Sequence, residues 1–337
     1  MEKKVSVIMS TYNTKKEFLT KAVDSILNQK YKNLEFIIIC DGSMEDYNIV
    51  KEYSDERIKL IFHNENRGLP QSLNEAIDIS TGEYIMRMDS DDISLKDRIS
   101  IQVEFLEKHK NIDVCGMYAK AIGEKNLIMT LFLNEPKYIA IQLLYRTCLI
   151  HPTVAFRRKI FENTDLRYNV NYTCAQDFEL WTRICNNNNN IAIIPKIGLK
   201  YRIHSEQASN EKKHIQEEFY KKTIKNNAKK INDDREKIEN LLLVLGEKQK
   251  INDTEYIKIA EDIDLMIENC DTFNKKDLKK VFYNRYFQLM IKNKYMQKNL
   301  KKIMKNKNLR RKILKVYNIK NIIHITYYDI LNIFCKY

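Results

Sequence analysis

Short apolar runs alternate with amphipathic segments over the first ninety residues, and this order constrains the fold more than any other feature of the chain. The run LEFIIIC at 34–40 is apolar almost throughout, which is typical of a strand covered on both faces of a sheet. Similar strands are expected at 5–10, 58–62 and 83–88. Apolar residues at helical spacing predict helices at 15–29, from about 45, and at 69–80. The resulting β-α-β-α-β-α-β order predicts an α/β domain with a mostly parallel sheet flanked by helices.

Glycine and proline mark a change in the chain near residue 200. All four prolines and six of the seven glycines precede that point, and only Gly246 follows it. A sequence with so few breakers is typical of packed helices. We therefore expect two domains, an α/β domain over 1–210 and an α-helical C-terminal region over 211–337.

The two parts also differ in charge. Basic and acidic side chains balance over 1–210, so the net charge of +13 arises within 211–337. Segment 272–320 is the most basic stretch, and Asp277 is its single acidic residue. Three interpretations remain open for this region: a helical subdomain with a solvated lysine-rich face, a membrane-surface anchor, or a nucleic-acid-binding surface.

Each interpretation of the basic region has a different physical basis. A solvated face needs no partner, whereas clustered lysines and arginines attract anionic lipid headgroups. Apolar residues at helical spacing in 319–337 would complete an interfacial helix, so the anchor would extend over 272–337. Nucleic acid is disfavoured because no recognition motif accompanies the charge.

The sequence also argues against secreted and membrane-spanning classes. The N-terminal stretch lacks an apolar run of signal-peptide length, and no run approaches the roughly 18 apolar residues of a membrane span. The seven cysteines are scattered without a Cys-x-x-Cys pair, which predicts reduced thiols rather than a disulfide frame or a zinc site. We expect a cytoplasmic protein.

Three carboxylates crowd the end of the strand expected at 83–88, in the stretch YIMRMDSDD. Like charges this close repel, so Asp89, Asp91 and Asp92 need a compensating partner. An Asp-x-Asp pair at a strand end suits a divalent cation shared with a diphosphate. The alternative is that Asp91 or Asp92 caps a helix beginning near Leu95, and Asp92 is the acid that a cap explains best.

Polar residues also follow the first two strands, where ligands of parallel sheets bind. Thr11 and Tyr12 come after the first strand and Asp41 after the second. Asp41 either accepts a hydrogen bond from a base or ribose, or forms an ordinary Asp-Gly turn. Arg67, in the loop before the helix at 69–80, either binds a diphosphate or is a surface cation.

Downstream, three further residues have two interpretations each. Asp177 precedes apolar residues at helical spacing and is either a general base or an ordinary acid at a helix start. His151 and His204 are lone histidines, which are more often structural than ligating.

In this order, the motifs resemble those of family 2 inverting glycosyltransferases, which have the A-type nucleotide-sugar-binding fold. The resemblance runs from about residue 5 to 207 and rests on SVIMSTYN, IIICDGS, NENRGLPQSLNEAI, YIMRMDSDD, HPTVAFRR, AQDFELWTRI and YRIHSEQAS. It is greatest to bacterial enzymes that build capsule, O-antigen or lipopolysaccharide sugars. The chain departs from the family pattern at four positions: Ser10, Cys40, Glu45 and Gln176.

The resemblance implies a role for each matching residue. Nucleotide binding falls to Thr11, Tyr12, Asp41 and Arg67, with Asp41 facing the base, usually uracil. Asp91 is implied as the ligand of Mn²⁺ or Mg²⁺, and Asp89 as facing the ribose or a metal-bound water. Asp177 is implied as the catalytic base, and His204 as a residue near the diphosphate that also serves as a metal ligand in some members.

The chemistry itself favours this function. Transfer from a nucleotide diphosphate sugar needs a base for the acceptor hydroxyl and positive charge for the leaving diphosphate. A single displacement inverts the anomeric centre. We expect a UDP-hexose donor and an acceptor hydroxyl on a growing surface glycan or lipid-linked saccharide. The alternatives are a non-catalytic nucleotide-sugar-binding protein and a nucleotidyltransferase, which SVIMSTYNTKK disfavours because it lacks glycine.

Overall fold

The computed structural model describes residues 2–131, 133–205, 213–229, 231, 235–246 and 253–292. The chain divides into two compact units, Met1–Leu143 with Thr147–Tyr220, and Leu144–Arg146 with Lys221–Tyr337. The boundary predicted at 210 lies outside the described residues and stays a prediction, as does the helix predicted at 319–337.

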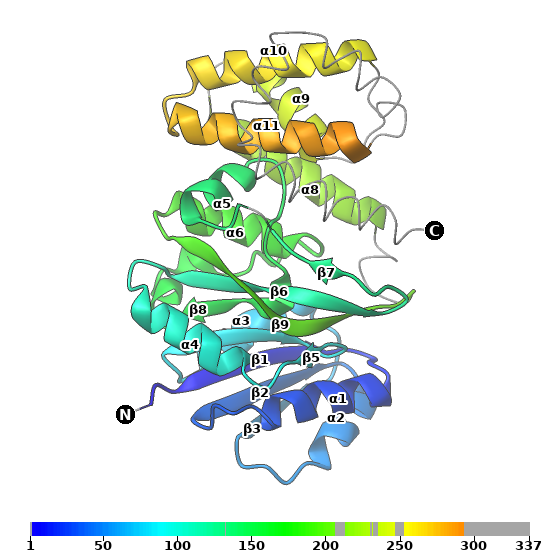
Figure 1. Cartoon of the computed structure of the whole chain (residues 1–337). Coiled ribbons are helices and arrows are strands. Elements are labelled where there is room, and N and C mark those ends of the chain that lie inside the picture. The colour runs from blue at the N-terminus through cyan, green and yellow to red at the C-terminus, as the bar shows by residue number, and fades with distance from the viewer. Residues whose placement is uncertain are drawn as a thin grey trace. The chain divides into compact units, whose positions relative to one another are not determined.

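The first unit begins with strands and helices in the predicted order (Figure 1). The seven elements are β1 (Val5–Thr11), α1 (Lys16–Leu27), β2 (Leu34–Asp41), α2 (Met44–Lys51), β3 (Ile58–His63), α3 (Leu69–Ile79) and β4 (Tyr84–Asp89). Strands β3, β2, β1 and β4 pair in parallel in that order. The α/β class with a parallel sheet half is confirmed.

The rest of the first unit extends the same sheet with mixed strand directions. Its elements are β5 (Ile93–Ser94), α4 (Arg98–Lys108), β6 (Val114–Gly123), β7 (Ile128–Met129), α5 (Pro136–Gln142), β8 (Ala155–Arg157), α6 (Gln176–Asn186) and β9 (Ile191–Ile203), with 3₁₀ turns at His151–Thr153, Arg158–Glu162 and Thr164–Leu166. Strand β8 runs antiparallel to both β4 and β6, while β9 pairs in parallel with β6. The full order is β3-β2-β1-β4-β8-β6-β9-β5.

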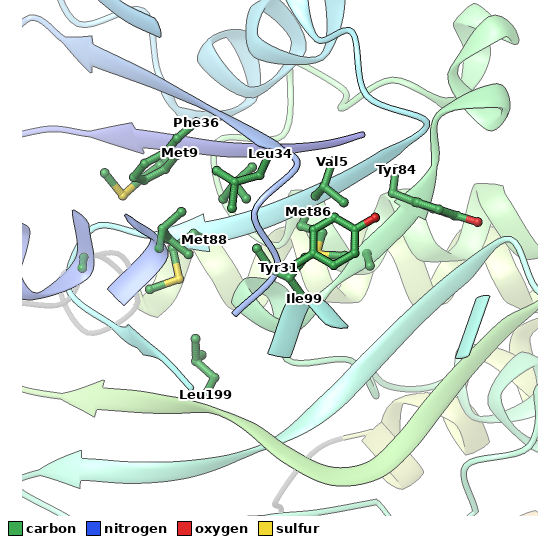
Figure 2. Close-up of a cluster of buried hydrophobic side chains, with 14 of the residues drawn as sticks. Val5, Met9, Tyr31, Leu34, Phe36, Tyr84, Met86, Met88, Ile99 and Leu199 are labelled. Carbon is green, nitrogen blue, oxygen red and sulfur yellow. The ribbon is translucent and has the colours of Figure 1, made fainter. Parts of the chain in front are cut away.

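The core explains why β2 carries a continuous apolar run. All eight residues of β2 are buried, because side chains on both faces of the strand are covered. Figure 2 shows a cluster of buried side chains from neighbouring strands on one face of the sheet, among them Met9, Phe36 and Met88. Each fully buried side chain of this size contributes about 1.5–3 kcal/mol of transfer free energy.

Helix α1 covers the sheet with Leu19, Ala22, Val23 and Ile26, as its spacing predicts. Phe18 shares that spacing but is only half-buried, because its ring packs against the end of β9 rather than into the core.

The regular structure in the described part of the second unit is helical. Its elements are α8 (Lys213–Ala228), which begins in the first unit, α9 (Arg235–Gly246), α10 (Asp253–Asn269) and α11 (Lys275–Lys292). Helices α9, α10 and α11 pack on one another. Buried Arg285 donates to the Leu245 carbonyl at 2.6 Å, which satisfies an unpaired group at the end of α9. No helix in the described part of the chain is long and apolar enough to cross a membrane.

Candidate active site

Strand register brings the predicted residues to one edge of the parallel half. Thr11 at the end of β1 lies opposite Cys40 of β2, and its neighbour Ser10 lies opposite Asp89 of β4. Asp41, the last residue of β2, lies opposite His63 of β3. Ligands of parallel sheets bind beyond these carboxyl ends, so the candidate site lies there.

A hydroxyl network anchors the loop between β1 and α1. The Thr11 hydroxyl donates to Asp46 Oδ2 at 2.5 Å, and the Thr14 backbone N–H donates to the same carboxylate. Thr14 Oγ1 lies 2.7 Å from the Ser90 hydroxyl, between Asp89 and Asp91 in sequence. The network therefore fixes the loop that presents Tyr12, whose side chain is exposed, beside the Asp89–Asp92 turn.

Asp46 is a site residue that sequence reasoning missed. It lies in the first turn of α2, where an acid is expected on general grounds, so nothing in the sequence distinguished it. In the structure it is fully buried, and burial raises its pKa while the Thr11 hydroxyl and the Thr14 N–H oppose the rise.

Asp41 is buried and fastens the loop before α3. Its Oδ1 accepts from the Arg67 backbone N–H, and its Oδ2 accepts from the Gly68 N–H, both at 2.9 Å. His63 Nδ1 lies 2.8 Å from Oδ1, and His63 Nε2 lies 2.9 Å from Glu75. Asp41 thus has a structural role, and its contact with a base stays a prediction. His63 and Glu75 were not identified from the sequence.

Glycine is required next to Asp41. At Gly42 φ is +86°, and a Cβ there would lie 2.5 Å from the Asn66 backbone nitrogen. The Asp-Gly pair therefore makes a turn and also admits the 64–68 loop against the strand end. The Arg67 side chain is half-exposed, 3.8 Å from Glu75, at the open side of this loop.

The three aspartates after β4 converge. One oxygen from each of Asp89, Asp91 and Asp92 lies within 4.8 Å of the others, and we call this set the acidic triad. Buried Arg87 forms an ion pair with Asp89 and compensates part of the charge. Burial raises the pKa of Asp89 to about 6 even though Arg87 opposes the shift. Burial and the neighbouring Asp89 and Asp91 charges raise the pKa of Asp92 well above its usual range.

Asp92 does not cap a helix, so that prediction is wrong. Helix α4 begins only at Arg98, after the short strand β5. Asp92 Oδ1 instead accepts from the Arg202 backbone N–H in β9 at 2.7 Å. Its Oδ2 is buried and has no hydrogen-bond partner within the described residues. The long-range contact to β9 could not be read from local sequence.

The triad's donor set fits a divalent cation. Three clustered carboxylates repel, and the buried, unpaired Oδ2 of Asp92 is costly without a positive partner. His204 Nε2 lies 3.0 Å from Asp91 Oδ2 and adds a nitrogen beside the carboxylates. Oxygen-rich ligands with one imidazole suit Mg²⁺ or Mn²⁺.

Asp177 lies in the first turn of α6, after Ala175 in a left-handed conformation with φ of 52°. Burial raises its pKa, although the Phe178 N–H and the Arg87 charge oppose the rise. The Asp177 charge in turn contributes to the raised pKa of Asp89, which places the two carboxyls in one electrostatic environment. A carboxylate with a raised pKa is a better general base than an ordinary helix-start acid.

His151 fits its structural interpretation. Its Nε2 lies 2.7 Å from the Tyr168 hydroxyl, and its ring meets Trp181 edge-on. Burial and the Arg87 charge lower the pKa of His151 well below its usual range, so the ring is neutral. Tyr168 is held by two hydrogen bonds of 2.9 Å between its backbone and Asn74 of α3.

Comparisons with known proteins cover the part of the chain that carries these residues. Residues 6–164 match the family described as Glycosyl transferase family 2. An uncharacterized glycosyltransferase of Haemophilus influenzae is 31% identical over 303 residues, which cover 85% of this chain and 86% of that protein. The Escherichia coli protein WfaP, a UDP-Glc:alpha-D-GlcNAc-diphosphoundecaprenol beta-1,3-glucosyltransferase, is 30% identical over 211 residues, or 62% of this chain and 80% of that one.

Solved structures agree on the fold. S. aureus TarS 1-349 in complex with UDP-GlcNAc has a TM-score of 0.57 at 17% identity, covering 93% of this chain and 89% of that chain. The identity is too low to show more than a shared fold, whereas the Haemophilus relative matches over most of both chains. The resemblance seen in the motifs is therefore confirmed: the chain belongs to glycosyl transferase family 2 and is a glycosyltransferase.

Proposed function

We propose that the chain transfers a hexose from a UDP-sugar to a hydroxyl of a growing surface glycan or a lipid-linked saccharide, with inversion. The observation that carries the proposal is the acidic triad, with a buried unpaired oxygen of Asp92, at the sheet edge that also bears Thr11 and Asp41. The names of the relatives support the donor and acceptor, since WfaP is described as using UDP-Glc and a diphosphoundecaprenol-linked acceptor.

The donor nucleotide is proposed to bind beside β1 and β2. Exposed Tyr12 offers an aromatic face, and Thr11 fixes its loop through Asp46. Asp41 accepts three hydrogen bonds from the protein and retains capacity for one more, which a base N–H can supply. Arg67 stands half-exposed at the open side of the loop, where a bidentate contact with phosphate oxygens is possible.

Asp91 and Asp89 are the residues proposed to hold Mn²⁺ or Mg²⁺, with His204 beside them. A divalent cation bound there supplies the positive charge that stabilises the leaving diphosphate. The chain's own cations compensate part of the negative charge at this site, because Arg87 is paired with Asp89 and the Arg202 side chain donates to the Asp91 carbonyl at 2.7 Å.

Asp177 is proposed as the base. It takes the proton of the acceptor hydroxyl while that oxygen attacks the anomeric carbon and the nucleotide diphosphate leaves with its bonding pair. One attack from the face opposite the leaving group inverts the centre. Burial keeps Asp177 basic, which suits this role better than an exposed carboxylate would.

The experiment that tests the proposal is a panel of nucleotide sugars assayed for binding and slow hydrolysis, with Mn²⁺, with Mg²⁺ and with chelator. We expect a metal-dependent response to UDP-hexoses and none to other nucleotide sugars. A response to no member of the panel would favour the non-catalytic alternative, and a GDP-sugar response would overturn the donor assignment.

A second proposal concerns the basic second unit, for which we propose peripheral attachment of a cytoplasmic protein to anionic membrane. Lys275, Lys276 and Lys279 are exposed on α11, where each can contribute about 1 kcal/mol near an anionic surface. Flotation with phosphatidylglycerol vesicles at two salt concentrations tests it. Wild type should float at low salt, and the triple Lys→Glu variant should float less. Equal behaviour of the two would remove α11 from the proposal.

A further inference from the structure

Phe18 lies on the apolar face of α1 but packs outside the core, and its neighbours indicate a role for its ring. The ring lies in the first turn of α1, half-buried. The Arg202 guanidinium stands over it, 4.1 Å from the ring centroid, and the His204 ring lies 5.6 Å away at a 49° tilt. Lys15 reaches the same ring from 5.9 Å. Phe18 thus contacts two side chains that belong to the end of β9.

Arg202 and His204 also join the end of β9 to the acidic triad. Arg202 donates its backbone N–H to Asp92 and its Nε to the Asp91 carbonyl, both at 2.7 Å. His204, one residue beyond β9, meets the Asp91 carboxylate. The two residues that make these contacts with the triad, Arg202 and His204, both pack on Phe18.

The ladder alone does not fix these side chains. Strand β5 pairs with β9 only at Lys200 and Leu199, before the segment begins. Pairing with β6 sets the backbone as far as Ile203, but backbone pairing does not by itself select the side-chain rotamers of Arg202 and His204. A planar ring beneath a guanidinium and beside an imidazole restricts both rotamers at once.

We propose that Phe18 is a positioning residue for the acidic triad: its ring holds Arg202 and His204 so that His204 Nε2 stays beside Asp91 where a divalent cation binds. The inference takes its cation from the proposed function. The packing of Phe18 on Arg202 and His204 involves only residues of the protein and needs no cation. An aliphatic side chain fills similar space without offering a ring face, so Phe18→Leu separates the ring from simple burial.

The first measurement needs no ligand. Hydrogen exchange of the Arg202 Nε–H, followed by NMR, reports whether the side chain stays bonded to the Asp91 carbonyl, and we expect exchange several-fold faster in Phe18→Leu than in wild type. Phe18→Tyr keeps the ring and should exchange as wild type does. Leu27→Ala, a half-buried change at the other end of α1, is the matched control for general loosening of the helix.

The second measurement is Mn²⁺ affinity in the presence of UDP, followed by electron paramagnetic resonance. Phe18→Leu should weaken it about fivefold, within the range of one or two cation–π contacts. Phe18→Tyr and Leu27→Ala should leave it unchanged. In turnover assays the Mn²⁺ concentration giving half activity should rise in proportion, with kcat at saturating Mn²⁺ changed less than twofold.

The outcomes separate the two proposals. Faster Arg202 exchange only in Phe18→Leu supports the positioning role, whether or not wild type binds Mn²⁺. A wild type that binds no Mn²⁺ would contradict the metal assignment instead. Unchanged Arg202 exchange in Phe18→Leu overturns the inference, as does a Phe18→Tyr protein that behaves like Phe18→Leu.

Discussion

The two halves of the first unit's sheet place functional residues in different ways. In the parallel half, β3-β2-β1-β4, each strand follows the last through one helix, and the site residues stand at the strand ends. In the other half, β8-β6-β9-β5, partners come from distant segments, as in the hydrogen bond of Arg202 to Asp92 across 110 positions.

Under the proposed function, this difference separates the residues that hold the nucleotide from those that activate the acceptor. The parallel half supplies the buried anchors Asp41 and Asp46, which fix loops and leave exposed side chains to meet a ligand. His204, just beyond β9, contacts Asp91 of the acidic triad, and the charge of Asp177 in α6 acts on Asp89. Changes in the second group should therefore affect chemistry and metal, and changes in the first should affect stability and donor affinity.

The largest effect is expected at Asp177. Asp177→Asn keeps the shape but cannot take a proton, so kcat should fall on the order of 100-fold or more. Donor affinity should stay within about threefold, because the donor anchors lie in the parallel half. Steady-state kinetics with saturating donor and metal measures both. Near-normal turnover would remove Asp177 from the role of base.

Loss of the metal ligand comes next. Asp91→Asn should lower kcat/KM on the order of 100-fold and abolish measurable Mn²⁺ binding in the presence of UDP. UDP alone should still bind, since Thr11 and Asp41 are unchanged. Calorimetry with and without Mn²⁺ makes the test, and full Mn²⁺ affinity in Asp91→Asn would contradict the assignment.

A pH effect of about tenfold per unit should follow from the triad. Because the pKa of Asp89 is raised to about 6, protons compete with the cation below that pH, and Mn²⁺ affinity should fall. For stability the sign is reversed: the metal-free folded state binds the proton more tightly than the unfolded chain does. The Tm without metal should therefore rise as pH falls from 7 towards 5. Thermal scans at several pH values, with chelator and with Mn²⁺, show whether the two trends oppose each other.

The sequence predicted the parallel half almost residue by residue, for a physical reason. Its strands are continuous apolar runs and the apolar residues of its helices recur at regular helical spacing, so β2 and α1 lie within two residues of their predicted ends. Asp41 and Asp89 could be located for the same reason, because they end such strands, and Asp91 lies two residues beyond Asp89.

What the sequence could not supply was the set of contacts between distant segments. His63 lies between the carboxylates of Asp41 and Glu75. The Phe18 ring packs against Arg202 of β9, and Asp92 accepts a hydrogen bond from the backbone N–H of β9. Each residue has an ordinary local explanation, as a strand end, a core residue or a helix cap. The contacts of Phe18 and Asp92 with β9 depend on the closure of the sheet through β8, β6 and β9, whereas His63 gains its partners from the pairing of β2 with β3 and from α3.

The smallest effect, and the sharpest contrast within the parallel half, is expected from two neighbours in α2. Asp46→Ala leaves the Thr11 hydroxyl and the Thr14 N–H without their buried acceptor, which should cost about 1–3 kcal/mol of unfolding free energy. The loop carrying Tyr12 should loosen, and donor KM should rise a few-fold with kcat nearly constant. Glu45→Ala, exposed and one position away, should change both quantities very little. Denaturant unfolding and donor KM for the two variants decide the matter. Equal effects would mean that α2 as a whole, rather than the buried Asp46 carboxylate, holds the nucleotide loop.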